Sequence, residues 1–279
     1  METIAHLRPR LHRYCSRMTG SVLDGEDVVQ EALFQAYRKL ETFDDARPLA
    51  PWLFRIAHNR CIDFLRRRGI REEAEAAVAE PAVTPPFDAA SPAIGKAVEH
   101  LVMTLPPKER ACVLLKDVFD YSLEEIAELV DSTIGGVKAA LNRGRSKLAD
   151  RTATSRPARP RTTQDTALLQ LYVDRFNQRD WDGLRELISA DARLQVADRF
   201  VGAFAESPYF GNYERLRPSW RLTVGEVDGE ATIILHAAAA DGWAPRAAVR
   251  LVIADGRIVG ITDYWHCPWV LSSASTLVV

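Results

Sequence analysis

The chain has 279 residues, a formal net charge of -2, 47% hydrophobic residues and 27% charged residues. This length suits about two domains, and the composition is ordinary for a soluble globular protein. No apolar stretch is long enough to span a bilayer, and the polar N-terminus lacks the apolar core of a signal peptide. Four scattered cysteines show no metal-type spacing. We therefore expect reduced thiols in a cytoplasmic protein with no membrane segment, metal or cofactor.

Changes of pattern divide the chain into five stretches. Residues 1–69 and 93–150 carry apolar side chains at helical spacing, which predicts two all-α domains. Residues 70–92 are acidic and then rich in Ala and Pro, which is typical of a flexible linker. Residues 151–164 form a second, basic linker. Residues 165–279 change character again and form the last domain.

The first stretch contains two helical runs. One carries acidic and amide residues opposite a set of apolar positions at helical spacing: Val28, Val29, Ala32, Leu33, Ala36 and Tyr37. The other begins after Pro48 and Pro51 and contains Trp52, which we expect in the core rather than on a nucleic-acid surface.

Residues 122–148 predict a helix-turn-helix. Ser122 and Glu125 have the spacing of a capping box, so one short helix begins there. Asp131 stands at the turn and tolerates a left-handed backbone, and Thr133 caps a second helix. That helix should direct Ile134, Val137 and Leu141 inward and basic residues outward. Such a helix fits a DNA major groove.

Charge supports DNA binding over the alternative of a helical hairpin with a merely solvated basic face. Residues 132–161 contain eight Lys or Arg residues and a single acid, Asp150, although the net charge of the whole chain is only -2. A local basic stretch of this kind indicates a phosphate-binding surface.

The last stretch predicts two amphipathic helices followed by an antiparallel meander. The first helix carries Leu168, Leu171, Tyr172 and Phe176, and the second carries Trp181, Leu184, Leu187 and Ile188. Strand-like segments at 220–227, 231–239, 247–254 and 257–265 follow, and Asp-Gly pairs at 228–229, 241–242 and 255–256 separate them. Asp-Gly between strands is a strong hairpin signal, so we expect an α+β domain with helices on one face of the sheet.

Three motifs resemble regions two and four of an extracytoplasmic-function (ECF) RNA polymerase sigma factor. Residues 24–31, DGEDVVQE, resemble the helix that docks on the polymerase, and residues 52–68, WLFRIAHNRCIDFLRRR, resemble the promoter-melting helix. Residues 105–110, LPPKER, resemble the entry into region four, and the helix-turn-helix follows at the family's spacing. The three motifs occur in the family's order and cover about half of the chain.

The resemblance implies a sigma factor that binds core RNA polymerase and directs promoter recognition and DNA melting. Polymerase docking would use Asp24, Asp27, Gln30 and Glu31, of which Asp27 and Gln30 are expected to face solvent. Asn59 would capture an unstacked base, while Arg55, Arg60, Arg66 and Arg67 would contact phosphates. The region-four contacts to promoter DNA would come from Thr133, Lys138, Asn142, Arg143 and Arg145.

The recognition helix departs from the family pattern. Asp131 replaces the usual turn glycine, and Gly136 and Ala139 stand where the family often has Thr or Ser. Fewer polar side chains remain to read base edges, so we expect minus-thirty-five readout to depend on phosphate contacts and DNA shape.

The last domain is similar in element order to the cone-shaped SnoaL-like polyketide cyclase and ketosteroid isomerase fold. In related sigma factors such a domain is a regulatory extension, which implies a small apolar ligand or a regulatory protein as its partner. His236, Asp263, Tyr264 and His266 are the polar candidates, but no catalytic set can be assigned, and we expect no enzyme activity. The alternative is a SnoaL-like enzyme or ligand sensor that a sigma-like head targets to DNA.

Overall fold

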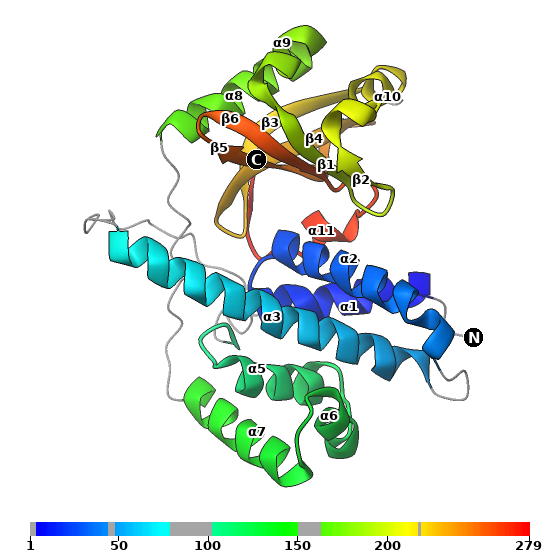
Figure 1. Ribbon diagram of the computed structural model, residues 1–279, viewed down its shortest axis with the longest axis vertical. Helices are drawn as coiled ribbons and strands as arrows, with labels where there is room; N and C mark the ends of the chain where they lie inside the picture. Colours follow the sequence, from blue (N-terminus) through cyan, green and yellow to red (C-terminus); the bar gives the residue numbers. More distant parts are fainter. Residues whose placement is uncertain (1–3, 44–47, 79–101, 150–162, 217–218) are drawn as a thin grey trace. The chain divides into compact units, whose positions relative to one another are not determined.

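A computed structural model describes residues 4–43, 48–78, 102–149, 163–216 and 219–279. The chain forms two compact units, Met1–Arg156 and Pro157–Val279, and each is described by itself (Figure 1). Among the described residues, no helix combines the length and the apolar character that crossing a membrane requires.

The first helical module of unit 1 consists of α1 (Ile4–Thr19), α2 (Val22–Arg38) and α3 (Leu49–Val78), with a short 3-10 turn η1 (Leu40–Thr42) after α2. Gly20 has a positive φ of 81° and separates α1 from α2, whose N-terminus is capped by Ser21. The predicted apolar positions of α2 are largely buried, including Val28, Val29, Ala32 and Ala36. Tyr37 was expected with them but is 77% exposed.

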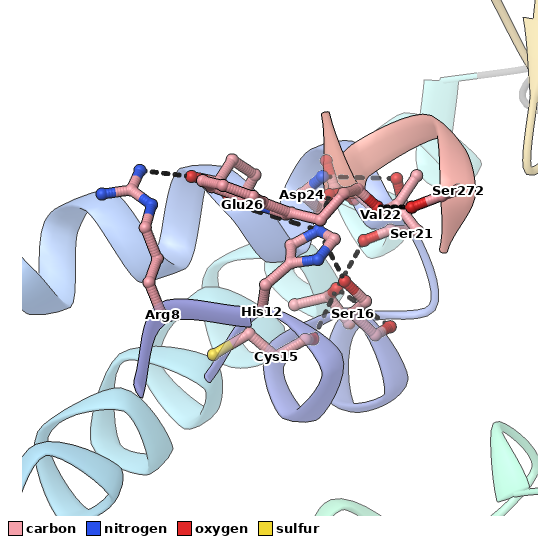
Figure 2. Close-up of polar contacts among 11 residues, drawn as sticks. Arg8, His12, Cys15, Ser16, Ser21, Val22, Asp24, Glu26 and Ser272 are labelled. Atoms are coloured by element: carbon pink, nitrogen blue, oxygen red, sulfur yellow. Dashed lines mark hydrogen bonds and ion pairs between the residues drawn. The ribbon is translucent and has the colours of Figure 1, made fainter. Parts of the chain in front are cut away.

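A buried polar network (Figure 2) joins α1 to α2, and a close approach at Gly25 adds to it. Arg8 forms an ion pair of 2.5 Å with Glu26, and Nε2 of His12 lies 3.0 Å from the carbonyl of Val22. A Cβ on Gly25 would lie 2.6 Å from Cα of Ser16, so only glycine permits this approach of the two helices. Glu26 therefore holds the module together, although it lies within the motif that resembles a docking helix.

The second helical module of unit 1 consists of α5 (Pro107–Val113), a π-type turn η2 (Leu114–Val118), α6 (Leu123–Leu129) and α7 (Ile134–Ala149). Pro107 occupies the first helical position, where its missing N–H costs nothing. The predicted capping box is confirmed, since Ser122 and Glu125 each accept a hydrogen bond from the other's backbone N–H.

The two modules of unit 1 share one apolar core. Helices α5 and α6 contact α3, α5 also contacts α1, and α7 packs on α5 and α6 (Figure 1). Helices α5 and α6 therefore form a layer between α3 and α7.

Unit 2 is an α+β domain, as the sequence predicts. Helices α8 (Thr163–Gln178) and α9 (Trp181–Leu187) precede a seven-stranded sheet of order β2-β1-β6-β5-β4-β3-β7. The strands are β1 (Ile188–Val196), β2 (Phe200–Ala203), β3 (Trp220–Val227), β4 (Glu230–Ala239), β5 (Gly242–Ala254), β6 (Arg257–Asp263) and β7 (Leu277–Val278). Short helical elements are η3 (Phe204–Glu206), α10 (Tyr209–Arg215) and α11 (Trp269–Ser272).

The predicted meander is confirmed, and its turns lie at the Asp-Gly pairs. Asp228, Gly229, Asp255 and Gly256 all have positive φ, the conformation of the type I′ turns that suit twisted hairpins. Strands β3 to β6 pair in antiparallel register around these turns.

Three strands that the sequence did not predict extend the meander. Strand β1 pairs in parallel with β6, and β2 and β7 extend the two edges. Ile188 was expected to end a helix but begins β1. The pairing partner of β1 lies about 70 residues later in the chain, so local periodicity gives no sign of it.

Candidate nucleic-acid interface and a buried polar cluster

The helix-turn-helix of the second module has the predicted turn. Asp131 adopts a φ of 49°, and the Thr133 hydroxyl accepts a hydrogen bond of 3.0 Å from the N–H of Gly136. Val137, Ala140 and Leu141 bury the inner face of α7. Ile134 was expected inward but is 39% exposed, because it occupies the first helical position, before the helix reaches the core.

Several basic residues of α7 form ion pairs with acidic residues elsewhere in the second module. Glu109 of α5 accepts hydrogen bonds from Nε of Arg143 at 2.9 Å and from Nζ of Lys147 at 2.8 Å. These hydrogen bonds hold the pKa of Glu109 below its usual range, and the bond from Lys147 has the larger effect. Arg145 pairs with Asp117 at 2.5 Å. The basic stretch seen in the sequence is thus partly neutralised within the fold.

Lys138 and Asn142 lie one helical turn apart on the exposed face of α7. Within the described residues, neither takes part in an ion pair or a side-chain hydrogen bond. Thr133 is also exposed, although its hydroxyl serves as the helix cap. Of the predicted region-four contacts, Lys138 and Asn142 are therefore the most available to DNA.

Helix α3 presents the predicted base-capture position to solvent. Arg55 and Asn59 are both exposed and lie one turn apart. Arg60 donates a hydrogen bond of 2.8 Å to Gln35 of α2, and Arg66 pairs with Asp63 at 3.3 Å.

Trp52, on the same helix, packs against the core and against Phe43, with ring centroids 4.6 Å apart. The half-buried Trp52 therefore packs against the core, as predicted.

The predicted docking residues of α2 differ in environment. Asp24 is buried and lies 3.6 Å from Arg68 of α3, which gives it a structural role that its sequence position did not reveal. Asp27 and Gln30 were expected to face solvent, but both are half-buried. Glu31 is exposed and lies 3.6 Å from Arg67, so a predicted docking residue touches a predicted DNA contact.

A second candidate site lies in the core of unit 2. Asp263, at the end of β6, is buried and accepts hydrogen bonds from the hydroxyls of Tyr209 at 2.9 Å and Tyr213 at 2.5 Å. The N–H of Trp265 donates to its other oxygen. Burial raises the pKa of Asp263, and the three hydrogen bonds offset this only in part. Sequence reasoning named Asp263 but missed both tyrosines, because α10 was not foreseen.

A third tyrosine completes this cluster. Tyr172 of α8 is fully buried, and its hydroxyl lies beside that of Tyr209 but forms no hydrogen bond of ordinary geometry among the described residues. Burial raises the pKa of Tyr172, and the negative charge of Asp263 raises it further. A buried donor without an acceptor costs free energy, and a ligand oxygen or a water molecule would satisfy it.

A cavity of about 390 Å³ opens at the surface beside the cluster. Phe204 and Phe210 line it, and both rings also contact the ring of Tyr209. Of the other polar candidates, His236 lies elsewhere, within hydrogen-bond distance of Thr223 at 2.9 Å, whereas His266 is close enough to Asp263 for their charges to interact. In the described part of the chain, no group of His, Cys, Asp or Glu is placed to hold a metal ion.

Comparisons with known proteins agree with this division. The family described as Sigma-70 region 2 matches residues 3–70, and the family described as Sigma-70, region 4 matches residues 95–148. The first helical module corresponds to region 2 and the second to region 4.

Two relatives cover these regions. The ECF RNA polymerase sigma factor SigW of Bacillus subtilis is 31% identical over 153 residues, which are 50% of this chain and 82% of SigW. SigG of Mycobacterium tuberculosis, also an ECF RNA polymerase sigma factor, is 32% identical over 241 residues and 75% of this chain. The chain spans 62% of the length of SigG.

Unit 2 has its own structural neighbour. A putative ketosteroid isomerase from Kribbella flavida matches 37% of this chain and 78% of its own, with 25% identity and a TM-score of 0.30.

Proposed function

The chain belongs to the ECF RNA polymerase sigma factor family, and on this premise we propose that it binds core RNA polymerase in the cytoplasm and directs promoter recognition and melting. The observation that supports this most strongly is the helix-turn-helix, whose α7 presents Lys138 and Asn142 on an exposed face. Exposed Arg55 and Asn59 on α3 supply the second DNA surface.

The two surfaces suit different steps. A helix that enters the major groove binds duplex DNA, whereas an exposed amide beside cationic groups suits bases that have left the stack. Asn59 is therefore assigned to melted DNA and α7 to the duplex. Docking on the polymerase is assigned to α2, where Glu31 is exposed and Asp27 and Gln30 are half-buried.

Run-off transcription tests this proposal. Purified chain and core RNA polymerase should together yield promoter-specific transcripts from a template that core polymerase alone does not use. Absence of transcripts from a library of genomic promoter fragments, with core binding also absent, would contradict the proposal.

Unit 2 is proposed to regulate this activity. The 13 residues 150–162 join α7 to α8, and a tether of this length gives a local concentration on the order of millimolar. Even a weak contact with region 2 or region 4 would then be populated. Truncation after about Asp150 should change promoter activity several-fold, in a direction that depends on whether unit 2 occludes or orients the two regions. Unchanged transcription and core binding would exclude such a role.

A small apolar molecule with a hydrogen-bonding oxygen is the partner that the Asp263 cluster supports. The buried hydroxyl of Tyr172 and the nearby cavity lined by Phe204 and Phe210 favour such a ligand. Binding of 2-naphthol to the full chain, followed by its fluorescence, should weaken in Tyr172→Phe and Asp263→Asn. Tyr37→Phe, which changes an exposed tyrosine, is the control. Chemical conversion of a ketone or phenol probe would instead favour an enzyme.

A further inference from the structure

We propose that unit 2 contains a second binding site, at which Arg199, Arg246 and His266 bind a small oxyanion, a carboxylate or a phosphate, beside the ring of Trp265. The inference goes beyond the proposed function, which assigns unit 2 only an apolar ligand at the Asp263 cluster. It concerns a ligand of unit 2 and does not depend on how the chain engages a promoter.

Backbone hydrogen bonds hold the segments that carry these residues side by side. In the sheet, β6 lies between β1 and β5 (Figure 1). Just beyond β1, the N–H of Ala197 donates to the carbonyl of Asp263 at 2.8 Å. Just beyond β6, the N–H of Tyr264 donates to the carbonyl of Ala248 of β5 at 3.0 Å. The three segments therefore meet at one end of β6.

Arg246 occupies a β-bulge in β5. The register between β4 and β5 shifts between Leu235 and His236, which leaves Arg246 without a partner across the two strands. A bulge redirects the side chain of its extra residue. The guanidinium of Arg246 lies over the ring of Trp265, 5.0 Å from its centroid. The bulge thus places a cation against a flat apolar surface.

Two tight turns carry the other two groups. Asp198 has a φ of 71°, a left-handed conformation that aspartate tolerates, and it stands in the β1–β2 hairpin directly before Arg199. The N–H of Cys267 donates to the carbonyl of Tyr264 at 3.0 Å, so His266 is a central residue of a β-turn. Turns at the end of a sheet commonly carry binding residues on a rigid scaffold.

The three side chains have donors to offer and no acceptor. In the part of the chain that the structure describes, neither guanidinium forms an ion pair or a side-chain hydrogen bond, and the same holds for the imidazole of His266. Arg246 and His266 are nevertheless half-buried. By contrast, Arg250 of the same strand is paired with Glu230 at 2.6 Å. An oxyanion would supply the missing acceptors.

Acidic neighbours leave room for such an anion. Asp198 and Asp263 are close enough to His266 to affect its pKa. The carboxylate of Asp263 already accepts three hydrogen bonds, and Asp198 is exposed to water, which screens its charge. Burial, followed by the charge of Arg199, lowers the pKa of His266, so its ring is neutral at pH 7 and can donate one hydrogen bond.

The chemistry of the site selects the ligand. The planar fork of a guanidinium matches the oxygens of a carboxylate or a phosphate. The half-buried ring of Trp265 offers a surface on which an apolar body attached to the anion can stack. Benzoate combines both features, and benzamide has the same shape without the charge. Inorganic phosphate represents an anion without an apolar body.

Calorimetric titration of the full chain with these three probes, in a chloride buffer of low ionic strength, tests the site. We expect saturable binding of benzoate or phosphate and none of benzamide. Tighter binding of benzoate would identify a carboxylate on an apolar body as the ligand, and tighter binding of phosphate would identify a phosphate ester. Absence of saturable binding of either anion at millimolar concentrations, or equal binding of benzamide, would overturn the proposal.

Substitutions locate the bound anion. Arg199→Gln and Arg246→Gln should each weaken binding by roughly ten-fold or more. Arg193→Gln is the matched control, since Arg193 is exposed on β1 and should be dispensable. Equal losses in Arg193→Gln and Arg199→Gln would overturn the site. If Arg246→Gln lowers the melting temperature, Arg199→Gln decides, because the side chain of Arg199 is exposed.

A crossed comparison separates this site from the Asp263 cluster. Tyr172→Phe should leave the affinity for the anion at the wild-type value, and Arg246→Gln should leave the binding of 2-naphthol unchanged. If Tyr172→Phe weakens anion binding as much as Arg246→Gln does, the anion lies in the tyrosine cluster and the second site is refuted. Failure of 2-naphthol to bind would count only against the apolar ligand.

Discussion

Lys138→Ala should remove one phosphate contact from DNA binding, with a salt signature that can be calculated. Each neutralised phosphate contributes about 0.9 to the slope of log K against log salt. A four-fold rise in salt, from about 50 to about 200 mM, then weakens each such contact roughly 3.5-fold. The affinity gap between wild type and Lys138→Ala should therefore shrink by that factor over this range. Fluorescence anisotropy with a short duplex of arbitrary sequence measures it, because phosphate contacts do not depend on sequence.

Arg143→Ala provides the comparison, because Arg143 is held by Glu109 in the free chain. If DNA displaces Glu109, Arg143→Ala should also lower the slope by about one unit. If the ion pair survives, the slope should stay at the wild-type value while Lys138→Ala still lowers it. A wild-type slope in Lys138→Ala would refute the reasoning, since Lys138 lies on the exposed face of α7.

Three further predictions follow from the environments of Asn59, α2 and His58. Asn59→Ala should reduce open-complex formation, measured by permanganate reactivity, far more than closed-complex binding, and equal losses in both would remove Asn59 from base capture. Asp27→Ala combined with Gln30→Ala should weaken retention of core polymerase in a pull-down while the thermal melt stays close to wild type; undiminished retention would contradict docking through α2. Burial lowers the pKa of His58 to about 4, so the unfolded chain takes up its proton first as pH falls. The stability that this contributes is complete above about pH 6.5 and is lost progressively toward pH 4, by about 3 kcal/mol in all. Guanidinium titrations of wild type and His58→Gln at several pH values should show this dependence only in the wild type, and parallel curves would contradict it.

Features that depend on a few neighbouring residues were predictable from the sequence. The capping box at Ser122, the left-handed turn at Asp131 and the hairpins at the Asp-Gly pairs all follow from local backbone chemistry. Each involves residues two to four positions apart, so the sequence contains the whole interaction. The core role of Trp52 could also be foreseen, from its place in an apolar helical run.

Features that join distant residues were not predictable. The pairing of Arg8 with Glu26, of Asp24 with Arg68 and of β1 with β6 depends on how separate elements meet. Spacing alone cannot tell a carboxylate that docks on a partner from one that meets an arginine of its own fold. The motif at residues 24–31 contains both kinds, since Asp24 and Glu26 are buried and Glu31 is exposed.

The same difference bears on how this chain reads a promoter. A count of basic residues suggests a strongly cationic recognition helix, yet Glu109 and Asp117 engage three of its cations. Gly135, Gly136 and Ala139 add no polar group to the exposed start of α7. With Lys138 on a phosphate, Asn142 is then the side chain best placed for a base edge, and each base pair read directly is worth about 1–3 kcal/mol of discrimination. One such side chain cannot specify a whole element, so the rest of the specificity has to come from DNA shape and from Asn59 once the strands separate.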